Sequence, residues 1–84
     1  MLRILFFASL REQLGTDRME LALPGEVDNV EALAGHLAGE GGDAWQVLLE
    51  DGQVLVAVDQ TIVDRRHPLE GDEEVAFFPP VTGG

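Results

Sequence analysis

The segment Leu2-Arg3-Ile4-Leu5-Phe6-Phe7-Ala8 decides the fold class, because it has the short length and the aromatic and branched composition of a β-strand. Successive side chains of a strand point to opposite faces. One face is purely apolar and carries Leu2, Ile4, Phe6 and Ala8. The other face begins with Arg3 and ends with Phe7. One of these faces must meet the core, and the strand therefore leaves an aromatic ring on its second face.

A short helical turn and a second strand follow this segment. Ser9 and Glu12 have the spacing of a capping box, in which each side chain satisfies a free backbone N–H at the start of a helix. Gly15 is suited to end that turn. We expect the second strand over residues 18–23, where a Pro-Gly turn ends it. The first two strands are predicted to form a hairpin.

The main helix is expected after this hairpin. Apolar residues recur there at the helical spacing i, i+3, i+4, i+7, at Val30, Leu33, Ala34 and Leu37. Asp28 or Asn29 can cap its first turn. Gly41-Gly42 interrupts the pattern, and Asp43 is expected to cap a second short helix that carries Ala44, Trp45, Leu48 and Leu49. A further turn is expected at Asp51-Gly52.

Two more strands are expected, over residues 54–58 and 75–78. In the last strand Val75 and Phe77 share one face, whereas Ala76 and Phe78 share the other. The order is strand, strand, helix, strand, strand, and a helix can cover one face of such a sheet. We therefore predict an α+β fold of the ubiquitin-like β-grasp type. It has a mixed sheet with the last strand beside the first, one main helix and short extra helices.

Composition limits what this chain can do. It has 84 residues, 16 Asp plus Glu against 5 Lys plus Arg, a net charge of −11 and no Cys. A single domain of this size holds one modest core, which argues against a deep catalytic site of its own. The absent thiols exclude disulfides and thiolate metal sites, and the acidic balance argues against nucleic acid and favours a basic protein partner.

Membrane and targeting signals are also missing from the sequence. No run approaches 18 apolar residues, and Met1 leads directly into the first strand without a charged leader. We expect a soluble cytoplasmic protein that has no membrane association.

The C-terminal residues Pro79-Pro80-Val81-Thr82-Gly83-Gly84 form a tail that the fold does not require. Two prolines end the last strand and favour an extended conformation. Glycines without Cβ atoms fit a narrow channel and leave a terminal carboxylate accessible. No residue from Val75 to Gly84 is charged. We predict a β-grasp domain over residues 1–78 and an extended, flexible tail over residues 79–84 that a partner protein buries.

Other side chains are weaker candidates for a site. If Phe6 and Phe77 fill the core, Phe7 and Phe78 lie together on the opposite face of the sheet, where an apolar patch usually marks an interface. The acidic run Asp72-Glu73-Glu74 lacks the alternating ligands of a calcium loop and is interpreted as a solvated turn. Neither His36 nor His67 has a neighbour at metal-ligand or triad spacing, so we predict no metal site.

The sequence resembles the small, sulfur-carrier subunits of molybdopterin synthase. The resemblance is carried by three groups of residues: Leu5-Phe6-Phe7-Ala8 with Arg11-Glu12 and Gly15, then Leu49-Glu50-Asp51-Gly52, Gln60-Thr61 and His67-Pro68-Leu69, and finally Asp72 through Gly84. It spans almost the whole chain.

The resemblance implies a cycle that is centred on Gly84. An activating enzyme related to the ubiquitin activators adenylates its carboxylate with ATP and Mg²⁺, and a sulfur donor protein converts it to a thiocarboxylate. Gly83 allows the tail to thread into the large catalytic subunit, where sulfur passes to cyclic pyranopterin monophosphate to make molybdopterin. The small subunit would then be non-catalytic and hold no permanent cofactor, within a heterotetramer.

The resemblance also implies a docking surface for these partners. It consists of Phe7, Ile62 and Phe78, continued by the tail residues Pro79, Pro80, Val81 and Thr82. The two prolines directly after the last strand also predict an extended tail, independently of the resemblance.

Three alternative functions stay open at this point. The chain could carry sulfur for thiamine or for tRNA thiolation, because such proteins share the Gly-Gly ending. It could be a ubiquitin-like protein modifier, although it has no Lys and could not form lysine-linked chains with itself. It could also be a plain binding domain with a frayed terminus.

Overall fold

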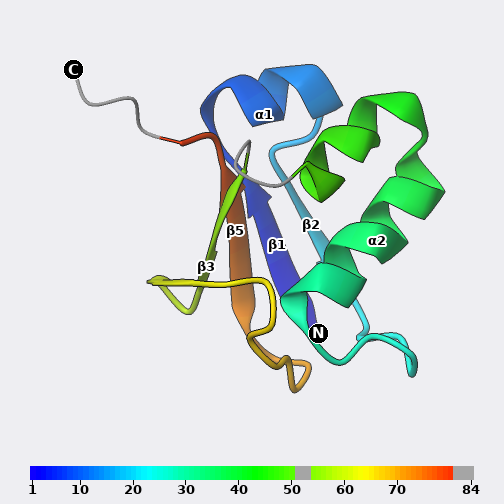
Figure 1. Ribbon diagram of the computed structural model, residues 1–84, viewed down its shortest axis with the longest axis vertical. Helices are drawn as coiled ribbons and strands as arrows, with labels where there is room; N and C mark the ends of the chain where they lie inside the picture. The colour runs from blue at the N-terminus through cyan, green and yellow to red at the C-terminus, as the bar shows by residue number, and fades with distance from the viewer. Residues whose placement is uncertain (51–53, 81–84) are drawn as a thin grey trace.

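A mixed five-stranded sheet with its helices on one side forms the fold (Figure 1). The computed structural model describes residues 1–50 and 54–80. The elements in chain order are β1 (Leu2–Phe6), α1 (Ala8–Leu14), β2 (Arg18–Leu21), α2 (Val30–Gly41), the 3₁₀ helix η1 (Asp43–Leu49), β3 (Leu55–Val58), β4 (Thr61–Val63) and β5 (Glu74–Phe78). The strand order across the sheet is β2-β1-β5-β3-β4. The predicted neighbourhood of the first and last strands is confirmed.

The central strands β1 and β5 run parallel, whereas β2 and β3 flank them in antiparallel orientation. Phe6 is aligned with Phe77 in the β1–β5 register. Both rings are buried and stacked, with centroids 5.8 Å apart. The Trp45 ring meets Phe6 edge-on at 5.2 Å, so the short helix η1 is anchored to the sheet through an aromatic contact.

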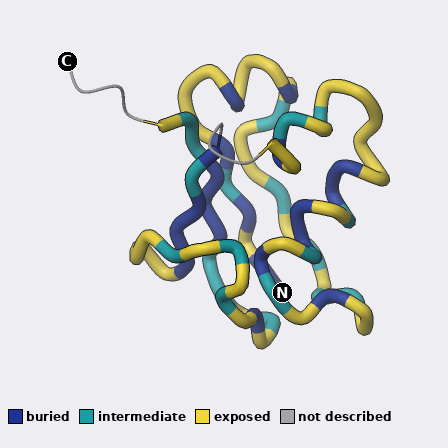
Figure 2. The backbone as a smooth tube through the Cα atoms, in the orientation of Figure 1, coloured by how far each residue is buried: buried dark blue, intermediate teal, exposed yellow. Residues whose placement is uncertain are grey.

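The helix α2 covers the inner face of the sheet with the predicted apolar stripe. Val30, Leu33, Ala34 and Leu37 are all buried, and the Asn29 side chain caps the helix by accepting from the Ala32 N–H at 2.8 Å. Figure 2 shows buried residues along the strands and on the side of α2 that faces them. The sequence therefore placed the core and its main helix correctly.

The predicted capping box at Ser9 and Glu12 is wrong. β1 ends at Phe6, and the helix α1 already begins at Ala8, with Phe7 as its N-cap and no side-chain cap. The carbonyl of Phe7 accepts from the N–H of Leu10 and of Arg11 instead. Because the chain turns at Ala8, whose φ is +55°, Ala8 is exposed and does not continue the inner face of β1. Gly15 ends the helix with a φ of +66°, as expected.

Three other local expectations need correction. β2 ends at Leu21, two residues before the expected bound. Asp43 is the first residue of η1 and caps nothing, since Gly42 occupies the N-cap position.

The strand β4 is absent from the sequence prediction, because its three residues are too few for a readable alternation. It pairs with β3 through a two-residue turn at Asp59 and Gln60, which both have positive φ, as a type I′ turn requires. The turn expected at Asp51-Gly52 lies outside the described residues.

A close approach at the end of α2 yields a stability prediction. A Cβ atom on Gly41 would lie 2.3 Å from the Cγ atom of Trp45. We expect Gly41→Ala to displace this ring from Phe6 and to lower the free energy of unfolding by about 1–3 kcal/mol. Gly39→Ala is the matched control, because a Cβ atom there meets no atom within 4 Å. The free energy of unfolding of this control should rise by roughly 0.5–1 kcal/mol, because Ala has a higher helix propensity than Gly. Urea unfolding of both variants measures the contrast, and equal stabilities would contradict the packing role of Gly41.

Candidate functional site

The outer face of the sheet carries a band of apolar side chains, in which Ala57 and Ala76 are buried and the larger residues around them are half-buried or exposed. In the strand registers Leu5 is aligned with Ala76, Ala76 with Ala57 and Ala57 with Ile62, which forms one row across four strands. A second row contains Phe78 aligned with Leu55, and Phe7 follows β1 one residue beyond the Phe6–Phe77 pair. We call these residues the outer patch: Leu5, Phe7, Leu55, Ala57, Ile62, Ala76 and Phe78.

Exposure differs sharply between the two aromatic pairs of β1 and β5. Phe6 and Phe77 are 1% and 0% exposed, whereas Phe7 is 45% exposed and Phe78 is half-buried. Ile62 is the most exposed large apolar side chain among the described residues, at 65%. The structure therefore brings Phe7, Ile62 and Phe78 onto one face, as the sequence predicted for the two phenylalanines. Exposed apolar surface of this kind is typical of a protein interface, and here it occurs in a chain whose net charge is −11.

The tail leaves the sheet at the edge of the outer patch. The Phe7 N–H donates to the carbonyl of Phe77 at 3.1 Å, which fixes the end of β5 beside the start of α1. Pro79 is half-buried and Pro80 is exposed, and neither belongs to a strand. This end of the sheet lies opposite the N-terminus (Figure 1). Val81, Thr82, Gly83 and Gly84 lie outside the described residues, so the predictions for them stay predictions.

Sequence reasoning missed Leu5 and Leu55 as members of the outer patch. Both are half-buried and stand beside the residues that were predicted. The alternation of β1 already placed Leu5 on the face of Phe7, and the same period places Leu55 opposite Val54 and Val56. The signal was present, but the β3–β5 register that aligns Leu55 with Phe78 cannot be read from one sequence.

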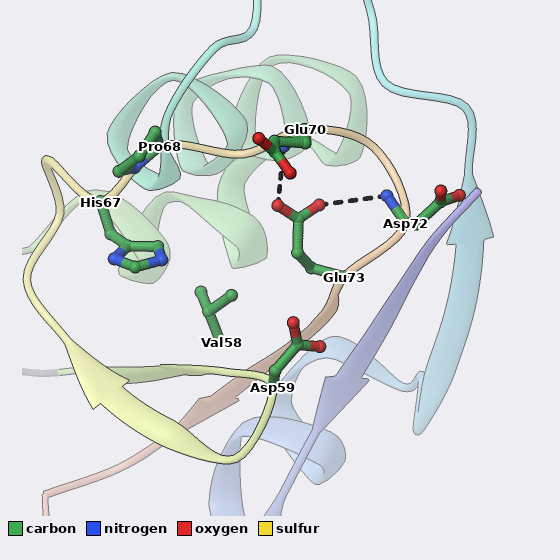
Figure 3. Close-up of a pocket in the computed structure, with 7 residues that line it drawn as sticks. All are labelled: Val58, Asp59, His67, Pro68, Glu70, Asp72 and Glu73. Atoms are coloured by element: carbon green, nitrogen blue, oxygen red, sulfur yellow. Dashed lines mark hydrogen bonds between the residues drawn. The ribbon is translucent and has the colours of Figure 1, made fainter.

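A hollow of about 440 Å³ lies at the other end of the sheet from the tail (Figure 3). Its lining is mostly acidic and includes Asp59, Glu70, Asp72 and Glu73 beside His67. The Glu73 carboxylate accepts hydrogen bonds from the backbone N–H groups of Glu70 at 2.7 Å, Gly71 at 2.8 Å and Asp72 at 3.1 Å. No group of three or more His, Asp or Glu side chains in residues 1–50 and 54–80 could hold a metal ion. Glu73 therefore closes a turn, in agreement with the structural interpretation of this acidic run.

Backbone donors control the charge of Glu73. Burial raises the pKa of its carboxyl group, but the N–H groups of Gly71, Glu70 and Asp72 outweigh burial and hold this pKa below its ordinary value. The carbonyl of Glu73 accepts from the Arg3 N–H at 3.0 Å, so the same turn aligns β5 with β1. Asp59 joins the end of β3 to the start of β5, because its carboxylate accepts a hydrogen bond from the Glu74 N–H at 3.0 Å.

Comparison with known proteins decides the family. The ThiS family matches residues 4–84, nearly the whole chain. The chain belongs to the ThiS family. It is 52% identical over 84 residues to the molybdopterin synthase sulfur carrier subunit of Escherichia coli, and each chain is covered completely. The sulfur carrier subunit of Haemophilus influenzae is 44% identical, again over the full length of both chains.

A solved structure bears out the fold of this ThiS-family chain. SAMP1 from Haloferax volcanii aligns with a TM-score of 0.72 over 99% of this chain and 98% of its own, at 24% identity. This likeness concerns the fold alone, and it confirms the β-grasp prediction. The full-length relatives identify the chain as a non-catalytic sulfur carrier subunit of molybdenum cofactor biosynthesis. Among the described residues, no helix is long and apolar enough to cross a membrane.

The turn at Glu73 predicts a pH-dependent stability difference. A carboxyl group whose folded pKa is depressed stabilises the fold above its unfolded pKa, and this contribution is lost as the pH falls through the folded pKa. We expect Glu73→Gln to cost about 1 kcal/mol at pH 7, because the neutral amide is a weaker acceptor for backbone donors. The cost should shrink steadily below about pH 4.5, near the ordinary pKa of Glu.

Chemical unfolding of both proteins between pH 3 and pH 7 measures this difference. Glu70→Gln is the matched control, since the Glu70 side chain accepts none of the hydrogen bonds that close this turn. A Glu73→Gln cost that stays constant over the whole pH range would contradict the role of the charge.

Proposed function

We propose that the C-terminal carboxylate of Gly84 is the sulfur-bearing group of this carrier. It is adenylated by an activating enzyme with ATP and Mg²⁺ and converted by a sulfur donor protein to a thiocarboxylate. It then delivers sulfur to cyclic pyranopterin monophosphate in the large subunit of molybdopterin synthase. The observation that supports this most directly is the point at which the tail begins. Phe78, inside the outer patch, leads directly into Pro79 and Pro80.

The chemistry of the tail supports a separate activation step. A carboxylate oxygen is a poor leaving group, and adenylation replaces it with a good one, after which sulfur can attack the carbonyl carbon. The resulting thiocarboxylate is readily ionised and nucleophilic. This chain contributes no thiol to these steps, because it has no Cys. Because adenylation consumes ATP, we place the cycle in the cytoplasm.

We further propose that the outer patch docks the large subunit and the activating enzyme. Phe7, Ile62 and Phe78 supply the exposed apolar contacts, while Pro79 and Pro80 direct the tail into the partner. Val81 and Thr82 would continue this contact inside the channel, and Gly83 would pass its narrowest part. The domain division into residues 1–78 and 79–84 follows from this proposal, since the body docks and the tail reacts.

The relatives favour molybdopterin over the other sulfur pathways. Both full-length bacterial relatives are sulfur carrier subunits of molybdopterin synthase. A role as protein modifier is the second candidate, because the modifier protein SAMP1 shares the fold. Exposure of the purified thiocarboxylate to a large subunit with its pyranopterin precursor separates these possibilities, because only the carrier proposal predicts molybdopterin as the product.

Intact mass tests the role of Gly84. Protein co-expressed with its activating enzyme and a sulfur donor should gain about 16 Da, the replacement of one oxygen by sulfur, confined to the C-terminal peptide. A variant that lacks Gly84 should show no gain and should support no product formation. Product formation by the variant at the rate of the full chain would contradict the proposal, as would an unmodified terminus in the full chain.

Substitution in the outer patch tests docking. Phe78→Asp should weaken binding to the large subunit by at least roughly tenfold, because it introduces a charge that the interface must desolvate. The fold should persist, since Phe78 lies on the outer face and the Phe6–Phe77 stack is untouched. Ala44→Asp on the exposed side of η1 is the matched control. Calorimetric titration measures both variants, and unchanged affinity for Phe78→Asp would refute the assignment of the docking surface.

A further inference from the structure

The strand β2 offers a hydrogen-bonding edge that no other strand of residues 1–50 and 54–80 covers. It is the outermost strand on one side of the sheet (Figure 1). The Phe6 N–H donates to the carbonyl of Asp17 at 2.9 Å, and the same register aligns Ile4 with Met19. Residues that bond the neighbouring strand alternate with residues that face away from it. The N–H and C=O groups of Arg18 and Glu20 therefore point outward from the edge of the sheet.

The side chains along this edge form a self-complementary pattern. Arg18 and Glu20 are exposed on the outer face and carry opposite charges two residues apart. Met19, between them, points inward and is half-buried. It lines a hollow of about 220 Å³ with Leu37 and Trp45, so apolar surface continues beneath the edge.

Backbone geometry restricts how two copies of β2 can pair. In an antiparallel pair related by a two-fold axis, outward-facing residues must lie opposite one another. Three registers satisfy this condition near the centre of β2: Arg18 opposite Arg18, Glu20 opposite Glu20, or Arg18 opposite Glu20. The first two place like charges in direct opposition, which is destabilising in a sheet. The third forms two identical Arg–Glu pairs and brings the two Met19 side chains together on the inner face.

We propose that the β2 edge binds the β2 edge of a second copy of this chain, antiparallel and in the register centred on Met19. The product is a continuous ten-stranded sheet across a two-fold axis. Charge complementarity specifies this occupant. When two copies of β2 run antiparallel, Arg18 of each copy lies opposite Glu20 of the other. An unrelated extended peptide would have to supply the same order of charges.

The dimer leaves the sulfur-carrying end accessible. β2 is separated from β5 by β1, and Pro79 follows β5. Phe7, Ile62 and Phe78 are not on β2, so the proposed docking surface and the proposed self-association can be tested separately. The proposal does not depend on the chemistry at Gly84.

Affinity should be low, because the edge strand has only four residues and the interface is far smaller than a standard one. Two chains that each carry a net charge of −11 also repel one another, although at 0.15 M salt this repulsion is screened beyond about 8 Å. We expect half-dimerisation at roughly 0.1–1 mM, in the range of small transient interfaces.

Sedimentation equilibrium of the full chain in 0.15 M salt tests the proposal. The mass should rise from 9.1 kDa toward twice this value with increasing concentration. Arg18→Glu and Glu20→Arg should each weaken association about tenfold or more, because each opposes like charges across the axis. The double variant R18E/E20R restores opposite charges and should return the dissociation constant to within about threefold of the original.

Net charge alone predicts a different pattern for these variants. Arg18→Glu makes the chain more acidic and Glu20→Arg makes it less acidic, so general repulsion would weaken one dimer and strengthen the other. Arg66→Glu and Glu26→Arg are matched controls that change the charge equally at exposed positions away from β2. Stronger association of Glu20→Arg would contradict the proposed register.

A backbone variant tests the hydrogen bonds of the edge, and Glu20→Gln is its matched control, because both variants remove the Glu20 charge but only proline removes the N–H. Glu20→Pro removes one outward N–H and leaves the bonds between Met19 and β1 in place, since proline is tolerated at an outer edge. It should abolish dimerisation, whereas Phe78→Asp should leave it intact. Thermal unfolding of each variant verifies the fold. A monomer at all concentrations up to about 2 mM, well above the range expected for a small interface, would overturn the proposal. A dimer that Phe78→Asp destroys and Glu20→Pro preserves would overturn it equally.

Discussion

The parallel pairing of β1 with β5 is the interaction on which the rest of the structure depends. It joins the two ends of the chain at the centre of the sheet and aligns Phe6 with Phe77 in the core. Because side chains alternate along a strand, the same register places Phe7 and Phe78 on the opposite face. One pairing therefore determines the buried aromatic stack, the outer patch and the point at which the tail leaves the sheet.

Two acidic side chains hold β5 against its neighbours at the end of the sheet away from the tail, Glu73 on the β1 side and Asp59 on the β3 side. Glu73 gathers three backbone donors and presents its own carbonyl to Arg3, and Asp59 binds the N–H of Glu74. These carboxylates accept backbone hydrogen bonds that stabilise the fold, although a cluster of acidic residues can also suggest a cation site. The proposed docking surface thus lies at one end of β5 and these structural hydrogen bonds lie at the other.

Sequence patterns predicted the elements that follow a clear period. The stripe from Val30 to Leu37 gave α2, and the alternation in residues 2–6 gave β1 and its buried face. The errors occur where local chemistry is ambiguous. Ser9 and Glu12 satisfy the capping-box spacing, yet the chain turns one residue earlier, at Ala8 in a left-handed conformation that the residue type does not indicate.

Contacts between distant segments lie beyond such patterns. The strand β4 is three residues long, and its place at the sheet edge depends on the positive φ of Asp59 and Gln60. Leu55 joins the outer patch only because β3 pairs with β5 in one register. For Phe7 and Phe78 the sequence sufficed, since alternation within each strand needs no knowledge of its neighbour. Ile62 required the family resemblance, because nothing in residues 61–63 alone indicates the face on which it lies.

The nucleophiles missing from the chain suit the chemistry proposed for its tail. An activated carboxyl group reacts with amines and thiols, yet the sequence contains neither Lys nor Cys. One amine is the α-amino group of Met1, which lies 3.3 Å from a carboxylate oxygen of Asp72. Because β1 and β5 run parallel, Met1 is located at the end of the sheet opposite Pro79. The amine therefore lies at the far end of the sheet from Pro79, where the tail begins, and this separation favours reaction of the proposed activated group with an external sulfur donor.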